Sequence, residues 1–174
     1  DVVVCYRAMN ERSGMRFGGA GYGNSPALPP WLAWYAPFGL LTPAAWVALH
    51  ARRYMHAYGV TNEHFGRIAV VDRTHAATNP QAWFYERPIT LDDHQRSRWI
   101  IEPVLRLLDC CQESDGGVAL VVTTPERARG LRQPPARIVA AAQGATEDSE
   151  MMTSYYRPEI TGLPEMGLVG RRLW

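Results

Sequence analysis

The sequence predicts an α/β protein, because strand-like and helix-like segments both occur along its 174 residues. Val2–Tyr6 and Val118–Thr123 are short runs of mostly aliphatic, β-branched residues, which is typical of strands buried on both faces. Arg137–Ala142 has a similar pattern and is expected to be a third strand. Residues 43–58 and 166–174 are expected to be helices.

Capping residues give the limits of the predicted helices. Thr42 is a suitable N-cap with Pro43 at the first helical position, and Gly59 is a suitable C-cap. A second helix is expected to begin after Thr61 and to stop at Asn79-Pro80. Thr90-Leu-Asp-Asp93 resembles a capping box at the start of a short helical turn.

The remaining segments are predicted to be loops, apart from a short helix over Pro125–Gly130. Ala8–Gly23 is rich in glycine and arginine, and Pro26–Gly39 is rich in proline and aromatic residues without a clear period. Pro134-Pro135 reads as a linker between two structural regions.

Bulk properties are those of an ordinary globular chain, with 47% hydrophobic and 20% charged residues. A formal net charge of +1 provides no field that would favour nucleic acid or a membrane surface. No apolar run approaches the roughly 20 residues of a transmembrane helix, and the start has no signal-peptide pattern. Three cysteines, an odd number, indicate reduced thiols, so we expect a cytoplasmic protein.

One stretch carries a specific resemblance. Leu107-Leu-Asp-Cys-Cys-Gln-Glu-Ser-Asp-Gly-Gly-Val-Ala-Leu-Val-Val122 is similar to the end of the N-terminal catalytic half of the thiolase superfamily. The most similar branch contains the thiolase half of sterol carrier protein X and the bacterial lipid-transfer-protein aldolases. Further segments resemble the same branch: Glu11–Gly18, Ala51–His56, Asp72–Pro80, Ser154–Glu159 and Leu163–Gly170.

The resemblance implies a thiolase-like fold, in which two halves stack as a five-layer αβαβα sandwich with an inserted loop domain. Residues 1–7 and 117–132 would end the N-terminal half, and residues 8–116 would form the loop domain and its connections. Residues 136–174 would begin the C-terminal half. We therefore expect the chain to be the central piece of a longer protein.

The resemblance also implies an activity, the retro-aldol cleavage of a steroid side-chain β-hydroxyacyl-CoA to a ketosteroid and propionyl-CoA. The substrate itself carries CoA, so no cofactor is implied. The implied partners are a second copy of the chain in a homodimer and an OB-fold protein that binds acyl-CoA. The family's acid/base candidates, tyrosines, would follow Trp174, and the nucleophilic cysteine of true thiolases would precede Asp1, so no catalytic residue is assigned here.

Two other functions stay open at this point. One is a CoA-dependent thiolase or acyltransferase of lipid metabolism, and the other is a non-catalytic binding or assembly module. For the favoured aldolase, we expect residues 1–174 alone to be inactive, because the strands of two different sheets cannot close a core by themselves.

The candidate substrate-binding residues come from three segments. Arg12, Met15 and Arg16 lie in the loop after the first strand, where ligands gather in α/β sheets. A guanidinium there can pair with a CoA phosphate or bridge two subunits. Trp46, together with the aromatic loop, can wall a steroid-sized pocket or simply anchor that loop. His75 is either a functional group on its helix face or a hydrogen-bonded core residue.

Other chemically suggestive residues favour structural roles. Cys110 and Cys111 precede a turn and a strand rather than a helix, and acidic residues follow them, so an activated thiolate is not expected. The histidines have no zinc-site spacing and are expected on helix faces and surfaces. The glycines between Gly18 and Gly23 form no nucleotide-binding motif, and the pair Tyr155-Tyr156 is suggestive by residue type alone.

Overall fold

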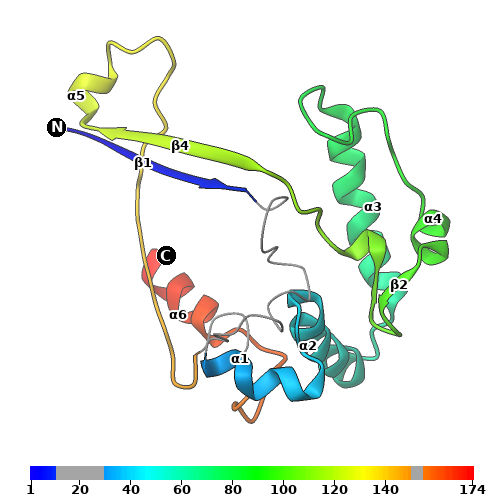
Figure 1. Cartoon of the computed structure of the whole chain (residues 1–174). Coiled ribbons are helices and arrows are strands. Elements are labelled where there is room, and N and C mark those ends of the chain that lie inside the picture. Colours follow the sequence, from blue (N-terminus) through cyan, green and yellow to red (C-terminus); the bar gives the residue numbers. More distant parts are fainter. Residues whose placement is uncertain (11–29, 150–154) are drawn as a thin grey trace.

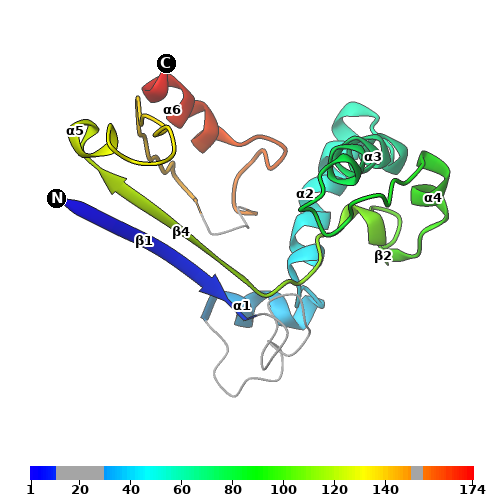
Figure 2. The ribbon, with the colours of Figure 1, turned by 90° about the horizontal axis from the view of Figure 1, so that it is seen from above.

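The computed structural model describes residues 1–10, 30–149 and 155–174. A long two-stranded ribbon of β1 (Val2–Met9) and β4 (Gly116–Thr123) leads to a helical region that contains α2 (Pro43–Tyr58), α3 (Asn62–Thr78) and α4 (Leu91–Arg96) (Figure 1). The view from above shows α6 (Pro164–Leu173) on the other side of the molecule from α3, near the end of the ribbon that carries α5 (Pro125–Ala128) (Figure 2).

The ribbon pairs the first and second predicted strands. β1 (Val2–Met9) is antiparallel to β4 (Gly116–Thr123), in a register that runs from Val2 opposite Thr123 to Met9 opposite Gly116. Both strands are longer than predicted, and the hydroxyl of Thr123 donates to the carbonyl of Asp1 at 3.0 Å.

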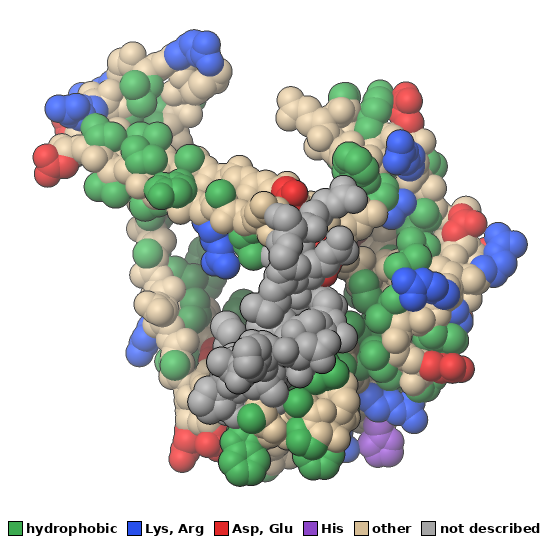
Figure 3. All heavy atoms as spheres, viewed as in Figure 1, with side chains coloured by type: hydrophobic (Ala, Val, Ile, Leu, Met, Phe, Trp, Pro, Cys, Tyr) green, Lys and Arg blue, Asp and Glu red, His purple; other side chains and the backbone are tan. Residues whose placement is uncertain are grey.

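The expectation that these two strands are buried on both faces is wrong for the described chain. Residues 2–9 and 116–122 are exposed, with Val4 at 59%, Tyr6 at 80% and Val118 at 69%. A two-stranded ribbon has no further strand or helix layer to cover it, although its apolar composition is that of an interior strand. Figure 3 shows apolar side chains at the surface around the N-terminal end of the ribbon.

The two main helices follow their predicted limits. α2 (Pro43–Tyr58) begins where the hydroxyl of Thr42 accepts a hydrogen bond from the Ala45 N–H at 3.3 Å, and ends at Gly59 with φ of 65°. α3 (Asn62–Thr78) has Thr61 as its N-cap, and its C-cap residue, Asn79, is extended.

Short elements surround these helices. α4 (Leu91–Arg96) has the expected capping box, in which Thr90 and Asp93 exchange hydrogen bonds. It is followed by a hairpin of β2 (Trp99–Ile101) and β3 (Leu105–Arg106), and then by the 3₁₀ turn η3 (Leu107–Asp109). This hairpin was not expected from the sequence, because its strands are only three and two residues long.

The aromatic segment is more regular than expected. α1 (Pro30–Tyr35) and the 3₁₀ turn η2 (Ala36–Phe38) replace most of the predicted loop over residues 30–39. Only Tyr35 of its described aromatic side chains is buried, whereas Trp34 and Phe38 are 72% and 81% exposed.

The C-terminal part departs from the prediction at one place. α5 (Pro125–Ala128) and α6 (Pro164–Leu173) form close to their expected positions. The expected third strand, Arg137–Ala142, has no strand partner among the described residues, and its Ile138 and Val139 are 69% and 86% exposed. Without a neighbouring strand to accept its backbone hydrogen bonds, the segment cannot form a ladder.

The small core lies in the helical region. Ala48 of α2 packs with Val104 and Leu105 of the β2–β3 hairpin. Partly buried residues surround this cluster: Ala44, Ala51, Met55, Phe65 and Ile101. The core therefore fixes α2 and α3 against the hairpin and leaves the ribbon outside it.

Candidate functional site

Helix α2 provides a common wall for two neighbouring cavities. Val47 and Ala51 of α2 and Phe65 of α3 line both of them. Val47 and Ala51 follow the i, i+4 spacing of one face of α2, the helix that begins at the Thr42 cap and ends at Gly59. The two cavities therefore meet at one apolar surface.

The first cavity lies between α2, α3 and the segment that leads to the cysteine pair, and has a volume of about 560 Å³. Most of its lining is aliphatic or aromatic, and Asp72 and Arg73 of α3 add charge. The guanidinium of Arg73 lies 3.6 Å from the ring centre of Phe84, a cation–π contact within this wall.

A buried polar network stands behind this cavity. The ring of His94 is fully buried, and its Nε2 lies 2.6 Å from Oδ1 of Asp109. The amide of Gln95 donates to His94 Nδ1 at 3.0 Å, so the pattern fits a ring that carries its proton on Nε2. Asp109 Oδ2 accepts from the Asn62 amide at 2.9 Å and from the Arg106 N–H at 2.7 Å. Each carboxylate oxygen thus has a donor.

The positive charge of the network belongs to Arg106. Its Nε donates to Asn62 Oδ1 at 3.0 Å, and its Nη1 donates to the Ser97 carbonyl at 2.7 Å. The guanidinium also stacks over the Trp99 ring at 3.7 Å. Because buried charge is costly without partners, this network ties α3 and α4 to the hairpin as one unit.

The cysteine pair occupies the edge of the first cavity. Cys110 and Cys111 both line it, and all three cysteines of the chain are free thiols. Burial raises the pKa of the Cys110 thiol, and the neighbouring Asp109 carboxylate raises it further. A thiol with a raised pKa is a poor nucleophile, which agrees with the structural role expected from the sequence.

The second cavity lies between α2 and the segment 157–166, and has a volume of about 700 Å³. It is lined mainly by apolar groups, with His50, Thr161, Arg157 and Glu165 among its polar residues. Arg157 Nη1 donates to Glu165 Oε2 at 3.1 Å, and Nη2 binds the other carboxylate oxygen and the Thr146 hydroxyl. These bonds lower the pKa of Glu165 to about 2, with the Arg157 contact as the main cause.

Aromatic and backbone contacts hold this segment on α2. The Tyr155 hydroxyl donates to the Trp46 carbonyl at 2.7 Å, and its ring stacks on His50 at 5.0 Å. His50 Nδ1 lies 3.0 Å from the Ile160 carbonyl. Burial raises the pKa of Tyr155, and the neighbouring Tyr35 adds to the effect, so its proton stays on the hydroxyl. Tyr156 is 61% exposed.

The candidate residues from the sequence do not meet at one described place. Arg12, Met15 and Arg16 lie outside the described residues. Trp46 is 1% exposed, its Nε1 donates to the Leu40 carbonyl at 2.6 Å, and it lines neither cavity. His75 is exposed on α3 and also lines neither cavity. Their substrate-binding roles stay predictions.

Sequence reasoning missed the buried polar network around Asp109, and it missed that His50 lines the second cavity. His94 was expected on a helix face or at the surface. It does lie on α4, but its ring is fully buried against Asp109, so the expectation of surface exposure is wrong for it. The two residues are 15 positions apart, a separation that no local pattern signals. For His50, its spacing from Val47 and Tyr54 on one face of α2 was an available signal.

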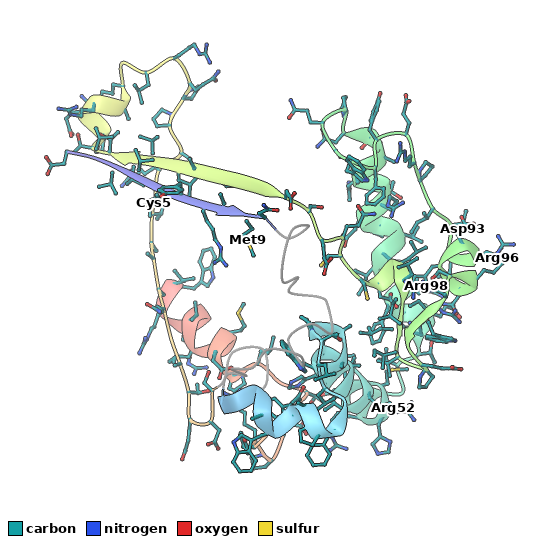
Figure 4. The ribbon with its side chains drawn as sticks, in the orientation of Figure 1. Cys5, Met9, Arg52, Asp93, Arg96 and Arg98 are labelled. Atoms are coloured by element: carbon teal, nitrogen blue, oxygen red, sulfur yellow. The ribbon has the colours of Figure 1, made fainter. Side chains whose placement is uncertain are left out.

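The charged residues of α4 lie away from the cavities, since none of them lines either one. Figure 4 shows Asp93 and Arg96 on the outer side of α4, with Arg98 just beyond it. Arg96 pairs with Asp92 at 2.7 Å in the i, i+4 arrangement, which is typical of a solvated helix face. Within residues 1–10, 30–149 and 155–174, no group of three histidine, cysteine or acidic residues is arranged to hold a metal ion. No helix in these ranges has the length and apolar character needed to cross a membrane.

Comparisons with known proteins give close relatives over the whole chain, although no family model matches. The chain is 67% identical to a "Steroid side-chain-cleaving aldolase" of Thermomonospora curvata, covering 100% of this chain and 45% of that protein. It is 60% identical to a "17-hydroxy-3-oxo-4-pregnene-20-carboxyl-CoA lyase" of Mycobacterium tuberculosis, covering 100% of this chain and 46% of that protein. The chain thus spans less than half the length of these relatives.

A solved aldolase structure also matches nearly the whole chain. The chain superposes on an "Ltp2-ChsH2(DUF35) aldolase" with a TM-score of 0.85 and 68% identity, over 99% of this chain and 43% of that one. More distant matches include an acetyl-CoA acetyltransferase of Methanothermobacter thermautotrophicus, 34% identical over 64% of the chain, and rat sterol carrier protein 2, 33% identical over 51%. The expected resemblance and the α/β thiolase-like fold are confirmed.

Proposed function

We propose, from the relationship of this chain to thiolase-like steroid side-chain aldolases, that it forms part of an enzyme that cleaves a steroid side chain by a retro-aldol reaction. The substrate would be a β-hydroxyacyl-CoA, and the products a ketosteroid and propionyl-CoA. The observation that carries the proposal is the match of the whole chain, at 67% and 60% identity, to two relatives whose names describe such a reaction.

The reaction makes definite demands on the protein. A base takes the proton of the β-hydroxyl, and the carbon–carbon bond then breaks as the carbonyl of the ketosteroid forms. The electron pair of that bond passes to the thioester as an enolate, which a hydrogen-bond donor stabilises and an acid protonates to propionyl-CoA. We assign none of these steps to residues 1–174 and propose that the reactive groups come from other parts of the intact enzyme.

The apolar ribbon supports a finer proposal about the fold. In a five-layer αβαβα sandwich, residues 1–7 and 117–132 would belong to an internal sheet of the N-terminal half. The pairing of β1 with β4 and the exposure of their apolar side chains are consistent with that place, because such strands need cover on both faces. Residues 8–116 would then be the loop domain, and residues 136–174 would start the C-terminal half.

Partners also belong to the proposal. We expect a homodimer and an OB-fold partner that helps to bind acyl-CoA. The name of the similar solved aldolase joins two components, Ltp2 and ChsH2(DUF35), which supports a two-component enzyme. Arg12 and Arg16 remain candidates for a CoA phosphate or for a contact between subunits.

Thiolase or acyl-transfer chemistry is the second candidate. The acetyl-CoA acetyltransferase relative favours it, but at 34% identity over 64% of the chain this match is much weaker. Cys110 does not supply the nucleophile that such chemistry needs, because burial raises its pKa.

The test uses the intact enzyme that contains this chain, incubated with a steroid side-chain β-hydroxyacyl-CoA. Mass spectrometry should detect a ketosteroid and propionyl-CoA in equal amounts without added free CoA. A requirement for free CoA as a reactant would instead support thiolysis. Residues 1–174 alone should give no product, and turnover by them would refute the placement of the reactive groups elsewhere.

A further inference from the structure

The second cavity has the size and lining of a small-molecule site. Its volume of about 700 Å³ lies within the range of roughly 300–1,000 Å³ in which ligand pockets fall. Apolar side chains form most of the wall: Val47, Ala51, Tyr54, Phe65, Ile160 and Leu163. Such a surface suits a rigid apolar ligand, since a wall of this kind cannot satisfy many polar groups.

Arg157, Glu165 and Thr161 at this cavity already have hydrogen-bond partners within the chain. Arg157 and Glu165 bind each other through both carboxylate oxygens. The Thr161 hydroxyl donates to Glu159 Oε1 at 2.6 Å. A ligand would therefore have to disrupt existing bonds in order to use these groups.

His50 differs from them. A carbonyl oxygen can only accept a hydrogen bond, so the 3.0 Å contact with the Ile160 carbonyl requires that Nδ1 carries a proton. In the neutral ring this leaves Nε2 as an acceptor. No hydrogen bond to Nε2 occurs among the described residues, and stacking on Tyr155 at 5.0 Å restrains the ring plane. His50, which lines the cavity, thus has a restrained ring and, in the neutral form, an acceptor at Nε2.

We propose that this cavity binds the fused rings of a hydroxylated steroid, and that Nε2 of His50 accepts a hydrogen bond from a hydroxyl of that ligand. The inference rests on the proposed function, because the steroid class comes from it, whereas the cavity and the acceptor come from the geometry. His50 is a binding residue in this account. It selects a ligand with a hydrogen-bond donor over one that lacks it.

The experiment measures binding of two CoA-free steroids to the intact enzyme. The probes are a 3-hydroxy steroid and the same compound without the 3-hydroxyl, so that the hydroxyl tested is not the β-hydroxyl from which the base takes the proton. We expect the hydroxylated probe to bind about tenfold more tightly, the effect of one hydrogen bond. His50→Asn keeps an amide N–H near the Nδ1 position for the Ile160 carbonyl and removes Nε2. This variant should bind both probes equally, with the affinity of the wild type for the deoxy compound.

Two further variants keep the test decisive. His50→Gln places its terminal amide near the Nε2 position and should retain part of the preference, so it separates loss of the acceptor from misfolding. Leu163→Trp should fill the cavity and weaken both probes more than tenfold. His56→Asn, on the exposed surface of the same helix, and Leu131→Trp, which lines neither cavity, are the matched controls.

A tenfold preference that persists in His50→Asn would overturn the role of His50, and unchanged binding of both probes in Leu163→Trp would overturn the site. Neither result touches the retro-aldol proposal, which fails only if the intact wild-type enzyme does not cleave the acyl-CoA substrate. The two proposals therefore fail in different assays.

Discussion

Nε2 of His94 lies 2.6 Å from Oδ1 of Asp109, and both side chains are almost completely removed from solvent. Asp109 also accepts two further hydrogen bonds, from Asn62 and from the Arg106 backbone. This arrangement fixes the wall of the first cavity, because the same carboxylate connects α3, α4 and the β2–β3 hairpin.

Replacing Asp109 should destabilise the helical region strongly. In Asp109→Ala three buried donors lose their acceptor, so we expect a loss of about 3 kcal/mol or more in the free energy of unfolding of the intact enzyme. Denaturant unfolding measures the loss. Asp92→Ala is the control, because its ion pair with Arg96 is exposed and should change little. Equal effects of the two substitutions would contradict the network's role.

Gly66 should be intolerant of even one added carbon. A Cβ there would lie 2.5 Å from His94 Nδ1 and 2.9 Å from Leu91 Cδ1. Gly66→Ala should therefore cost about 1–3 kcal/mol through overpacking, although alanine is the better helix former. Gly170→Ala in α6 meets nothing within 4 Å and should be neutral or stabilising. Thermal unfolding compares the two, and a stabilised Gly66→Ala variant would show that α4 packs differently.

Substitution of Trp46 should mainly reduce the stability of the fold. Its side chain is 1% exposed, and its Nε1 donates to the Leu40 carbonyl. Trp46→Ala should cost about 3–5 kcal/mol, as large-to-small substitutions in a core do. Trp46→Phe keeps most of the ring and loses the donor, so it is the variant in which to measure steroid-CoA affinity. Reduced affinity in a stably folded Trp46→Phe enzyme would support the predicted substrate-binding role, and unaltered affinity would remove it.

The Arg157–Glu165 pair should make stability sensitive to acid. The pKa of Glu165 is lowered from 4.5 to about 2 in the folded chain, so the pair's contribution is complete above pH 4.5. It is lost as the pH falls from there to about 2, because the unfolded state takes up the proton first. Glu165→Gln should be less stable than wild type at neutral pH, and the difference should shrink over this window. Melting temperatures measured across it test the sign. Glu63→Gln, in an exposed pair with Arg67, is the control.

Local signals sufficed for the two main helices, α2 and α3, and failed for contacts between distant residues. Thr42, Pro43 and Gly59 set the limits of α2 because caps act within one turn of the chain. The partnership of His94 with Asp109 depends on how α4 packs against the hairpin, which no nearby residue encodes.

For the strands, the prediction from sequence failed in a different way. The apolar composition of Val118–Thr123 indicated a strand correctly, but burial is a property of the layers around a strand. Likewise, Arg137–Ala142 has a strand-like composition without a described partner strand. For the candidate site, the resemblance indicated the steroid class, whereas the second cavity and the His50 nitrogen that has no hydrogen bond among the described residues required coordinates.

The central claim is that other parts of an intact aldolase cover the apolar ribbon. Cys5 tests it most directly, because its thiol is exposed on β1 in the described chain, and Figure 4 shows it on the same side of the strand as Met9. The measurement is the alkylation rate of Cys5 in the intact native enzyme, followed by mass spectrometry, relative to the rate in denaturant. The account predicts that labelling is at least a hundredfold slower in the native enzyme, on the order of the protection given by opening that costs about 3 kcal/mol. Equal rates would contradict it.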